Sequence, residues 1–260
     1  MKAEIVKHRE SVLEREYCLL EQARESLAGK SRVCRLGDIG CGPFGLLGVK
    51  GKRLSELQAG SVGVDLDLAT LKRNANVTHR VCASCYSLPF ATASLDFVVC
   101  RWVFEHLENP EMAMREFSRV LKPGGFLYIK TPNLWNYGMM LSRVTPTAFH
   151  NAFRCAAGLR ENSRTFYRAN TKHKLGKLAS KTAFAVHAVE FHSNSYNYYG
   201  FNKYLFLLMR SLSRLMARVT DRAQQILLCV MRNVGTDQSA SPSQAPRHSE
   251  NEALREAGVS

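Results

Sequence analysis

The stretch Arg35-Leu36-Gly37-Asp38-Ile39-Gly40-Cys41-Gly42-Pro43-Phe44-Gly45 determines how the rest of the chain is interpreted. The apolar run that precedes the glycines, from Val33 to Ile39, predicts a buried strand, and the glycines predict a turn after it. Gly40, Gly42 and Gly45 form the pattern G-x-G-x-x-G, which fits several nucleotide-type ligands and many purely structural turns. The pattern therefore indicates a ligand only together with the sequence around it.

The next segments complete a strand-helix-strand unit and extend it. Residues 62–65, Val-Gly-Val-Asp, predict a second strand whose last residue, Asp65, lies 25 positions after Gly40. A carboxylate at this place accepts hydrogen bonds from ribose hydroxyls in nucleotide-binding folds. Further strands are expected near 81–83, over 95–100 and over 126–129, with an amphipathic helix over 111–121. This alternation predicts a doubly wound α/β sheet with its ligand at the strand carboxyl ends.

Changes in composition along the chain predict where its segments begin and end. Residues 1–30 predict a charged N-terminal helix, and residues 31–200 the main α/β domain. Residues 133–171 are aromatic, basic and rich in Asn, and we expect an insertion after the fifth strand that covers the acceptor. A helix over 172–180 and strands over 185–191 and 196–199 are expected to follow.

The last third of the chain predicts a helix and a tail. Arginines recur at steps of four, at Arg210, Arg214, Arg218 and Arg222, with leucines on another face, so 201–232 is expected to form one basic amphipathic helix. Residues 233–260 are rich in Ser, Gln, Pro and Glu, and are expected to be disordered.

Charge and cysteine content narrow the class of protein. The net charge of +14 is concentrated in residues 133–232, which carry 15 Lys and Arg against 3 Asp and Glu, and this indicates a polyanionic substrate or surface there. No apolar run is long enough to span a membrane and the N-terminus is too charged for a signal peptide, so we expect a cytoplasmic protein with reduced thiols. Cys82 and Cys85 have zinc spacing but lack a second pair, so no metal is expected.

Two residues of the glycine turn favour one ligand class over another. Asp38, two residues before Gly40, would repel a pyrophosphate but attract a ligand with a cationic amino group. Pro43 removes a backbone N–H where a phosphate needs donors. These features favour S-adenosylmethionine over a dinucleotide.

Six blocks in this order and spacing then carry a resemblance to a known family. They are Asp38-Ile39-Gly40-Cys41-Gly42, Val62-Gly63-Val64-Asp65, Ser87-Leu88-Pro89-Phe90, Leu95-Asp96-Phe97-Val98-Val99, Val103-Phe104-Glu105-His106-Leu107 and Arg119-Val120-Leu121-Lys122-Pro123-Gly124-Gly125. With these blocks the chain resembles a class I S-adenosylmethionine-dependent methyltransferase of the type 11, ubiquinone-biosynthesis-like branch. The resemblance implies a Rossmann-like, mostly parallel seven-stranded sheet in a three-layer α/β/α arrangement.

The resemblance also implies roles for individual residues. Asp38 would face the methionine amino group, Gly40 and Gly42 would admit the methionine half, and Asp65 would hold the ribose. Cys41, Leu66 and Ser84 complete the expected cofactor-binding set. The chain departs from the family pattern in two places. Ser84 stands where the family often has an Asp that faces the adenine amino group, and the third glycine is displaced from position 44 to position 45.

The acceptor is less defined than the methyl donor. Cys100-Arg101-Trp102-Val103 replaces the Asn/Asp-Pro-Pro-aromatic motif of nucleic-acid amino methylation, and no Pro-Cys nucleophile is present. We therefore expect a small-molecule, sugar or lipid-linked acceptor and an O-methyl product, with nucleic acid disfavoured. His106 is the candidate catalytic residue, and His150, Tyr167 and His173 are further candidates for a general base.

Other interpretations of the same residues stay open. The basic helix over 201–232 could dock on an anionic membrane, which would make the protein peripheral, or could close one face of the sheet. The strand-helix-strand unit and its glycines also fit an NAD(P)-dependent oxidoreductase. The basic excess fits a non-catalytic, RNA-binding module with a methyltransferase-like fold.

Overall fold

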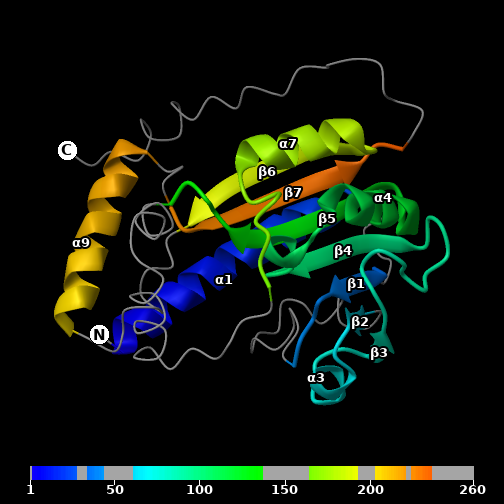
Figure 1. The fold of residues 1–260 in the computed structure, drawn as a ribbon, viewed down its shortest axis with the longest axis horizontal. Helices are drawn as coiled ribbons and strands as arrows, with labels where there is room; N and C mark the ends of the chain where they lie inside the picture. Colours follow the sequence, from blue (N-terminus) through cyan, green and yellow to red (C-terminus); the bar gives the residue numbers. More distant parts are fainter. Residues whose placement is uncertain are drawn as a thin grey trace.

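A seven-stranded sheet organises the chain (Figure 1). The computed structural model describes residues 2–27, 34–43, 61–136, 164–192, 203–220 and 224–235. The strands are β1 (Leu36–Ile39), β2 (Ser61–Asp65), β3 (His79–Cys82), β4 (Leu95–Arg101), β5 (Leu121–Pro132), β6 (Phe184–His192) and β7 (Ile226–Asn233). The helices are α1 (Lys2–Glu25), α3 (Leu68–Lys72), η3 (Phe104–His106), α4 (Pro110–Val120), α7 (Lys172–Lys181) and α9 (Lys203–Val219).

The strand order is β3-β2-β1-β4-β5-β7-β6. All pairings from β3 to β5 are parallel, whereas β7 runs antiparallel to both β5 and β6. The expectation of a Rossmann-like, mostly parallel seven-stranded sheet is therefore confirmed. Because the chain starts at β1 and winds outward in both directions, the sheet has a switch point between β1 and β4, which is where such folds bind ligands.

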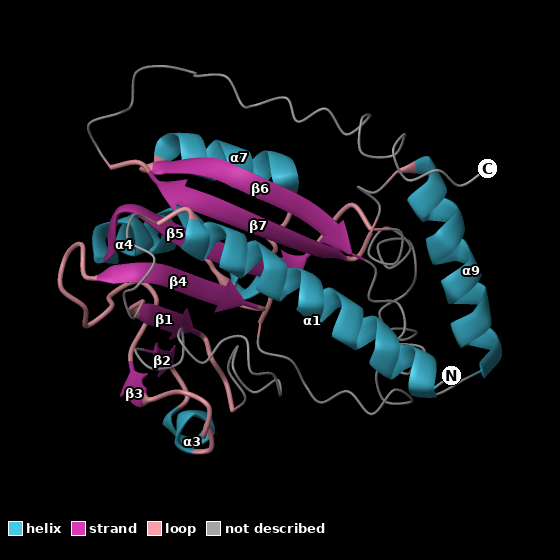
Figure 2. Cartoon of the chain, turned by 180° about the vertical axis from the view of Figure 1, so that it is seen from behind, coloured by secondary structure: helices cyan, strands magenta, loops and turns pink. Residues whose placement is uncertain are grey.

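Helices cover the two faces of the sheet. Helices α4 and α7 lie on one face, in front of β5 to β7 in Figure 1, and α1 crosses the other face in Figure 2. Strand β4 reads as a nearly continuous apolar run because it is buried on both faces, from Phe97 to Cys100. The three-layer arrangement follows from these two helix layers around one sheet.

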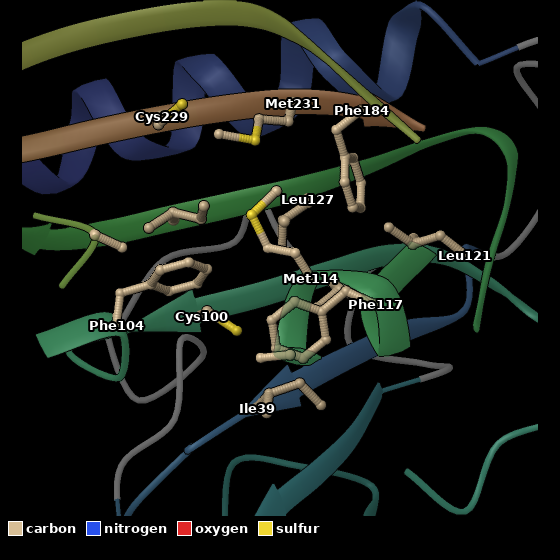
Figure 3. Close-up of a cluster of buried hydrophobic side chains, with 14 of the residues drawn as sticks. Ile39, Cys100, Phe104, Met114, Phe117, Leu121, Leu127, Phe184, Cys229 and Met231 are labelled. Atoms are coloured by element: carbon tan, nitrogen blue, oxygen red, sulfur yellow. The ribbon is translucent and has the colours of Figure 1, made fainter. Parts of the chain in front are cut away.

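The α4 side of the core illustrates how local signals and burial agree. The side chain of Asn109 accepts a hydrogen bond from the Met112 backbone N–H, and Pro110 takes the first helical position, where no backbone donor is needed. Met114 and Phe117, one turn apart, then point into the cluster of buried side chains shown in Figure 3. The face of α4 that the sequence pattern marks as apolar is the face that packs on the sheet.

The α1 side of the core contains ionised groups as well as apolar ones. Leu19, Leu20 and Ala23 pack against the sheet together with other buried apolar residues. On the same helix, the fully buried Glu16 forms ion pairs with Lys130 and, at 3.3 Å, with Arg101. The attachment of α1 to the carboxyl ends of β4 and β5 therefore depends on this charge cluster, because removing one partner would leave a buried charge uncompensated.

The prediction of one helix over 201–232 is wrong. Helix α9 ends at Val219, and Ile226–Asn233 forms β7, inserted between β5 and β6. The run Ile-Leu-Leu-Cys-Val-Met is buried along its whole length, as befits a strand covered on both faces. The arginine spacing suggested that the helix continued, but a short apolar run fits a buried strand equally well. The α/β domain consequently extends beyond residue 200.

Several other expectations fall on residues outside the described ranges. These are the central part of the insertion (137–163), the proposed strand over 196–199 and nearly all of the tail over 233–260. The helix expected over 172–180 and the strand expected over 185–191 correspond to α7 and β6. Among the residues that the structure describes, no helix is long and apolar enough to cross a membrane.

Candidate functional site

The glycine turn follows β1 at the switch point of the sheet. The backbone N–H groups of Gly40 and Cys41 donate to the Val64 carbonyl at 2.7 and 3.2 Å, which ties the turn to β2. Gly40 has φ +69°, and a Cβ built there would lie 2.3 Å from Cγ2 of Val103. A side chain at this position would therefore meet both backbone strain and a clash with the segment that follows β4.

The second turn glycine faces open space instead. Gly42 has φ +55°, and a Cβ built on it would meet no atom within 4 Å. Its backbone N–H donates to Oδ2 of Asp65 at 2.9 Å, and its carbonyl accepts from Asn74 at 2.8 Å. The turn is thus held from both sides and leaves an unfilled approach to its backbone, which is what a ligand that contacts a glycine turn requires.

Asp65 links this turn to the end of β2. Its Oδ1 accepts a hydrogen bond from the Asp67 backbone N–H at 3.0 Å, while Oδ2 accepts from Gly42. Each carboxylate oxygen offers about two acceptor positions, so the carboxylate keeps acceptor capacity for further donors such as ribose hydroxyls. Leu66, the next residue, exposes 72% of its surface although it is apolar.

The remaining predicted cofactor residues surround the same edge. Asp38 is buried in β1, and Cys41 is buried with a thiol pKa raised to about 12 by burial, so this thiol stays protonated and unreactive. Ser84 follows β3 in a short turn, where its Oγ accepts from the Tyr86 backbone N–H at 3.2 Å. The preceding residue, Ala83, donates its backbone N–H to the Asp65 carbonyl at 3.2 Å, which connects this turn to the end of β2.

The segment after β4 forms the other side of the site. Trp102 adopts φ +61°, and Val103, which abuts Gly40, leads into η3 with Glu105 and His106. Nδ1 of His106 lies 2.9 Å from the Arg164 backbone carbonyl oxygen. The structure thus places His106 next to the end of the basic insertion, three residues after the Val103 that abuts the glycine turn.

Glu105 is the centre of a buried polar network that the sequence did not predict. Its side chain accepts a hydrogen bond from Thr131 at 3.1 Å, and Thr131 in turn accepts one from Asn170 at 2.5 Å. Burial raises the pKa of Glu105. These groups come from three distant segments, so no local sequence pattern marks the network, although Glu105 itself lies in the Val-Phe-Glu-His-Leu block that follows β4.

The other candidate bases differ in how the structure places them. Tyr167 contributes its backbone N–H to the Glu105 carbonyl at 3.2 Å and has φ +51°. His173 lies on the exposed side of the first turn of α7. His150 is outside the described ranges. The hydrogen bond to Arg164 fixes the His106 side chain shortly after β4.

Comparisons with known proteins agree with this geometry. Residues 37–129 match a family model described as a methyltransferase domain. This segment therefore resembles the methyltransferase domains of that family. An ubiquinone biosynthesis O-methyltransferase of Xanthomonas oryzae pv. oryzae is 32% identical over 119 residues, which make up 43% of this chain and 46% of that protein. The enzyme of the same name from Cupriavidus pinatubonensis is 30% identical over 115 residues, 41% of this chain and 43% of that protein. The chain therefore spans about half the length of the curated relatives it matches.

Solved structures extend the likeness from the domain to the fold. An S-adenosylmethionine-dependent methyltransferase of Archaeoglobus fulgidus superposes with a TM-score of 0.51 at 17% identity, covering 85% of this chain and 94% of that one. At this identity the likeness concerns the fold. The expected class I fold and the resemblance to the type 11 branch are confirmed. The cofactor that the family match implies is S-adenosylmethionine.

The described residues fit this cofactor. The open approach at Gly42 suits a ligand that lies against the turn, the spare acceptors of Asp65 suit ribose hydroxyls, and an exposed Leu66 beside them suits an adenine ring that would cover it. Among the described residues, no group of three or more His, Cys, Asp or Glu could hold a metal ion. The described cysteines, including Cys82 and Cys85, are free thiols.

Proposed function

We propose that this protein transfers a methyl group from S-adenosylmethionine to an oxygen of a small-molecule, sugar or lipid-linked acceptor. The observation that carries the proposal is the hydrogen bond from the Gly42 backbone N–H to Asp65, which holds a carboxylate with spare acceptor positions beside an open glycine turn. The family match over residues 37–129 supports the donor, and the names of the relatives support oxygen as the methylated atom. Asp38, Gly40, Cys41, Gly42, Asp65, Leu66 and Ser84 are the proposed cofactor-binding residues.

Methyl transfer from a sulfonium is an in-line displacement, so the protein mainly aligns the reactants and excludes water. An acceptor hydroxyl also needs a group that takes its proton. A backbone carbonyl can only accept, so Nδ1 of His106 must donate to Arg164, and Nε2 is then the ring nitrogen that carries the lone pair of the neutral imidazole. We assign to this Nε2 the role of proton acceptor.

The test combines donor binding with turnover. Titration of the protein with S-adenosylhomocysteine and with NADH distinguishes a methyltransferase from an oxidoreductase, and binding of NADH alone would overturn the proposal. Turnover is measured with labelled S-adenosylmethionine and fractionated cell extract, followed by mass spectrometry of the compound that gains a methyl group. His106→Gln should lower kcat by about a hundredfold while leaving S-adenosylhomocysteine affinity unchanged.

We also propose that α9 docks on an anionic membrane surface, which would give access to a lipid-linked acceptor. The apolar side chains of Tyr204, Leu208 and Leu215 follow one stripe of the helix and are 82%, 64% and 57% exposed. Lys203 and Arg214 are exposed on the neighbouring stripe, and the helix carries no acidic residue. An exposed apolar stripe bordered by cations suits insertion at the surface of an anionic bilayer.

The position of α9 adds to this proposal. In both views α9 lies beyond the ends toward which β4 and β5 point, so a bilayer that contacts α9 would face the same edge of the sheet as the glycine turn (Figures 1 and 2). Salt-sensitive RNA binding by the same basic surface is the competing outcome. A non-catalytic RNA-binding protein would bind RNA and turn over no acceptor.

Co-sedimentation with vesicles of neutral lipid, with and without phosphatidylglycerol, tests the docking. The triple variant Tyr204→Ser, Leu208→Ser, Leu215→Ser should lose most of its vesicle binding. The control Leu68→Ser, Met112→Ser, Val186→Ser removes three exposed apolar side chains from other elements and should bind as the unaltered protein does. Equal binding of the triple variant, or binding of the unaltered protein to RNA but not to anionic vesicles, would refute the membrane proposal.

A further inference from the structure

The described end of the insertion, residues 164–171, is fixed against the site at several points. The backbone N–H groups of Phe166 and Tyr167 both donate to the Glu105 carbonyl, at 2.7 and 3.2 Å. The Arg164 carbonyl accepts from His106, and Asn170 anchors the far end through Thr131. A segment held in this way presents its side chains at a defined place, immediately beside His106.

Two arginines of this segment are arranged around one aromatic ring. The guanidinium carbons of Arg164 and Arg168 lie 5.0 and 5.6 Å from the ring centroid of Phe166. Both arginines are exposed. Stacking on an aromatic ring orients a guanidinium group and reduces the conformational freedom that it loses when it binds an anion. The Phe166 ring therefore restrains two guanidinium groups that lie around it.

The surroundings of the two arginines are also positive. Helix α7 begins directly after the segment, with Thr171 as its N-cap, no acidic residue in its first turn and the exposed cations Lys172 and Lys174 there. The partial positive charge of a helix N-terminus adds to these side chains. None of the ion pairs formed among the described residues pairs an acid with Arg164, Arg168 or Lys172. Like charges repel one another, and a bound anion would offset this repulsion.

We propose that Arg164 and Arg168 bind an oxyanion, a phosphate or carboxylate group, of the methyl acceptor and so orient its hydroxyl toward His106. This inference rests on the proposed methyltransferase function and specifies the acceptor class: a hydroxyl compound that also carries an anionic group. Planar guanidinium forks pair with two oxygens of such a group, which fixes direction as well as distance. The hydrogen bond between Nδ1 of His106 and the Arg164 backbone carbonyl ties the segment that carries the arginines to the proposed base.

The first experiment needs no known acceptor. Inorganic pyrophosphate, a probe with several oxyanion oxygens, is titrated calorimetrically into the full chain saturated with S-adenosylhomocysteine. The double variant Arg164→Gln, Arg168→Gln should bind pyrophosphate about tenfold more weakly than the unaltered protein, because charge-assisted hydrogen bonds to both forks are lost. The control Arg115→Gln, Lys177→Gln removes the same charge from exposed positions on α4 and α7 and should change the affinity less than twofold.

The second experiment identifies the source of the oxyanion. Cell extract is separated by anion exchange at neutral pH, and each fraction is assayed for methyl acceptance from labelled S-adenosylmethionine. We expect the acceptor in the retained fractions. Prior phosphatase treatment should abolish acceptance if the oxyanion is a phosphate monoester and leave it intact if it is a carboxylate. The Arg164→Gln, Arg168→Gln variant should raise KM for the retained acceptor about tenfold with little change in kcat.

The outcomes separate this inference from the proposed function. Acceptance confined to the unretained, uncharged fraction, or equal pyrophosphate affinity in the double variant and the control, would overturn the oxyanion site and leave the methyltransferase proposal intact. Failure to bind S-adenosylhomocysteine would instead refute the proposed function. A loss of pyrophosphate binding with unchanged S-adenosylhomocysteine affinity supports the oxyanion site specifically.

Discussion

Replacement of Gly40 by Ala tests the contact between the glycine turn and the segment after β4. A Cβ at this position would lie 2.3 Å from Cγ2 of Val103, well inside van der Waals contact, and the residue would have to keep φ +69°. A left-handed conformation costs a residue with a Cβ about 1–2 kcal/mol. Insertion of a methyl group into a packed site costs a further ~1–3 kcal/mol.

The two costs are separable because Val103 contributes only to the second. We expect Gly40→Ala to lower the free energy of unfolding by about 2–5 kcal/mol. In a Val103→Ala background, which removes the clashing Cγ2, the same substitution should cost only about 1–2 kcal/mol. Gly42→Ala, with φ +55° and no atom within 4 Å of the added Cβ, should cost about 1–2 kcal/mol without any dependence on Val103.

Urea unfolding of the four proteins of the Gly40/Val103 cycle measures the coupling directly. Gly176→Ala serves as a control for the method, because Gly176 lies within α7 with open space around its Cβ position, and its substitution should stabilise the protein by about 0.5–1 kcal/mol. A coupling energy below about 0.5 kcal/mol would mean that Val103 does not limit the space at Gly40. The arrangement of the turn against the end of β4 would then be incorrect.

Three further predictions concern individual carboxylates. Asp65→Ala should weaken S-adenosylhomocysteine binding by about 1–3 kcal/mol in calorimetric titration, through lost ribose bonds and an unpaired Gly42 N–H, and an unchanged affinity would exclude the carboxylate from the cofactor site. Burial raises the pKa of Glu105 above 4.5, so the folded state holds this proton more tightly than the unfolded chain does. As pH rises above about 4.5, the free energy of unfolding should therefore fall relative to that of Glu105→Gln, and parallel pH profiles in urea titrations would contradict this. Burial alone would raise the pKa of Glu190, but hydrogen bonds from His192 and Arg15 hold it at about 2. The free energy of unfolding should thus exceed that of Glu190→Gln by its full amount above pH 4.5, and the difference should decline as pH falls toward 2, which is the opposite sign from Glu105. The absence of such a difference would show that the ion pair between α1 and β6 contributes nothing to stability.

The parts of the fold that the sequence predicts are those encoded by neighbouring residues. Strands β1, β2 and β4 and helix α4 follow from apolar runs, glycine turns and the Asn109–Pro110 start, and their order determines the parallel half of the sheet. Strand β7 was missed because two patterns meet in this part of the chain. The arginines recur at helical spacing, and they lead into an apolar run that has the length of a strand. Only its place between β5 and β6 distinguishes them.

The candidate site also contains a part that the sequence predicts and a part that it does not. The glycine turn and Asp65 could be predicted because each ends a recognisable strand, and the structure brings them together through one hydrogen bond. The bonds from Asn170 to Thr131 and from Thr131 to Glu105 join residues 39 and 26 positions apart, so they exist only once the sheet and the insertion are in place. No periodicity or spacing in the sequence reports contacts of this kind.

The pairing of β6 with β7 has a consequence for how this protein could vary. These strands are antiparallel neighbours, with His192 opposite Ile226, so residues 193–225 with α9 occupy the place of an ordinary hairpin turn. A connection at that point can be lengthened, shortened or exchanged at a cost of only about 0.6 kcal/mol per doubling of its length. The helix proposed to meet the membrane is therefore a module that can be replaced by a tight turn, so that attachment and chemistry could be inherited, lost or engineered independently of each other.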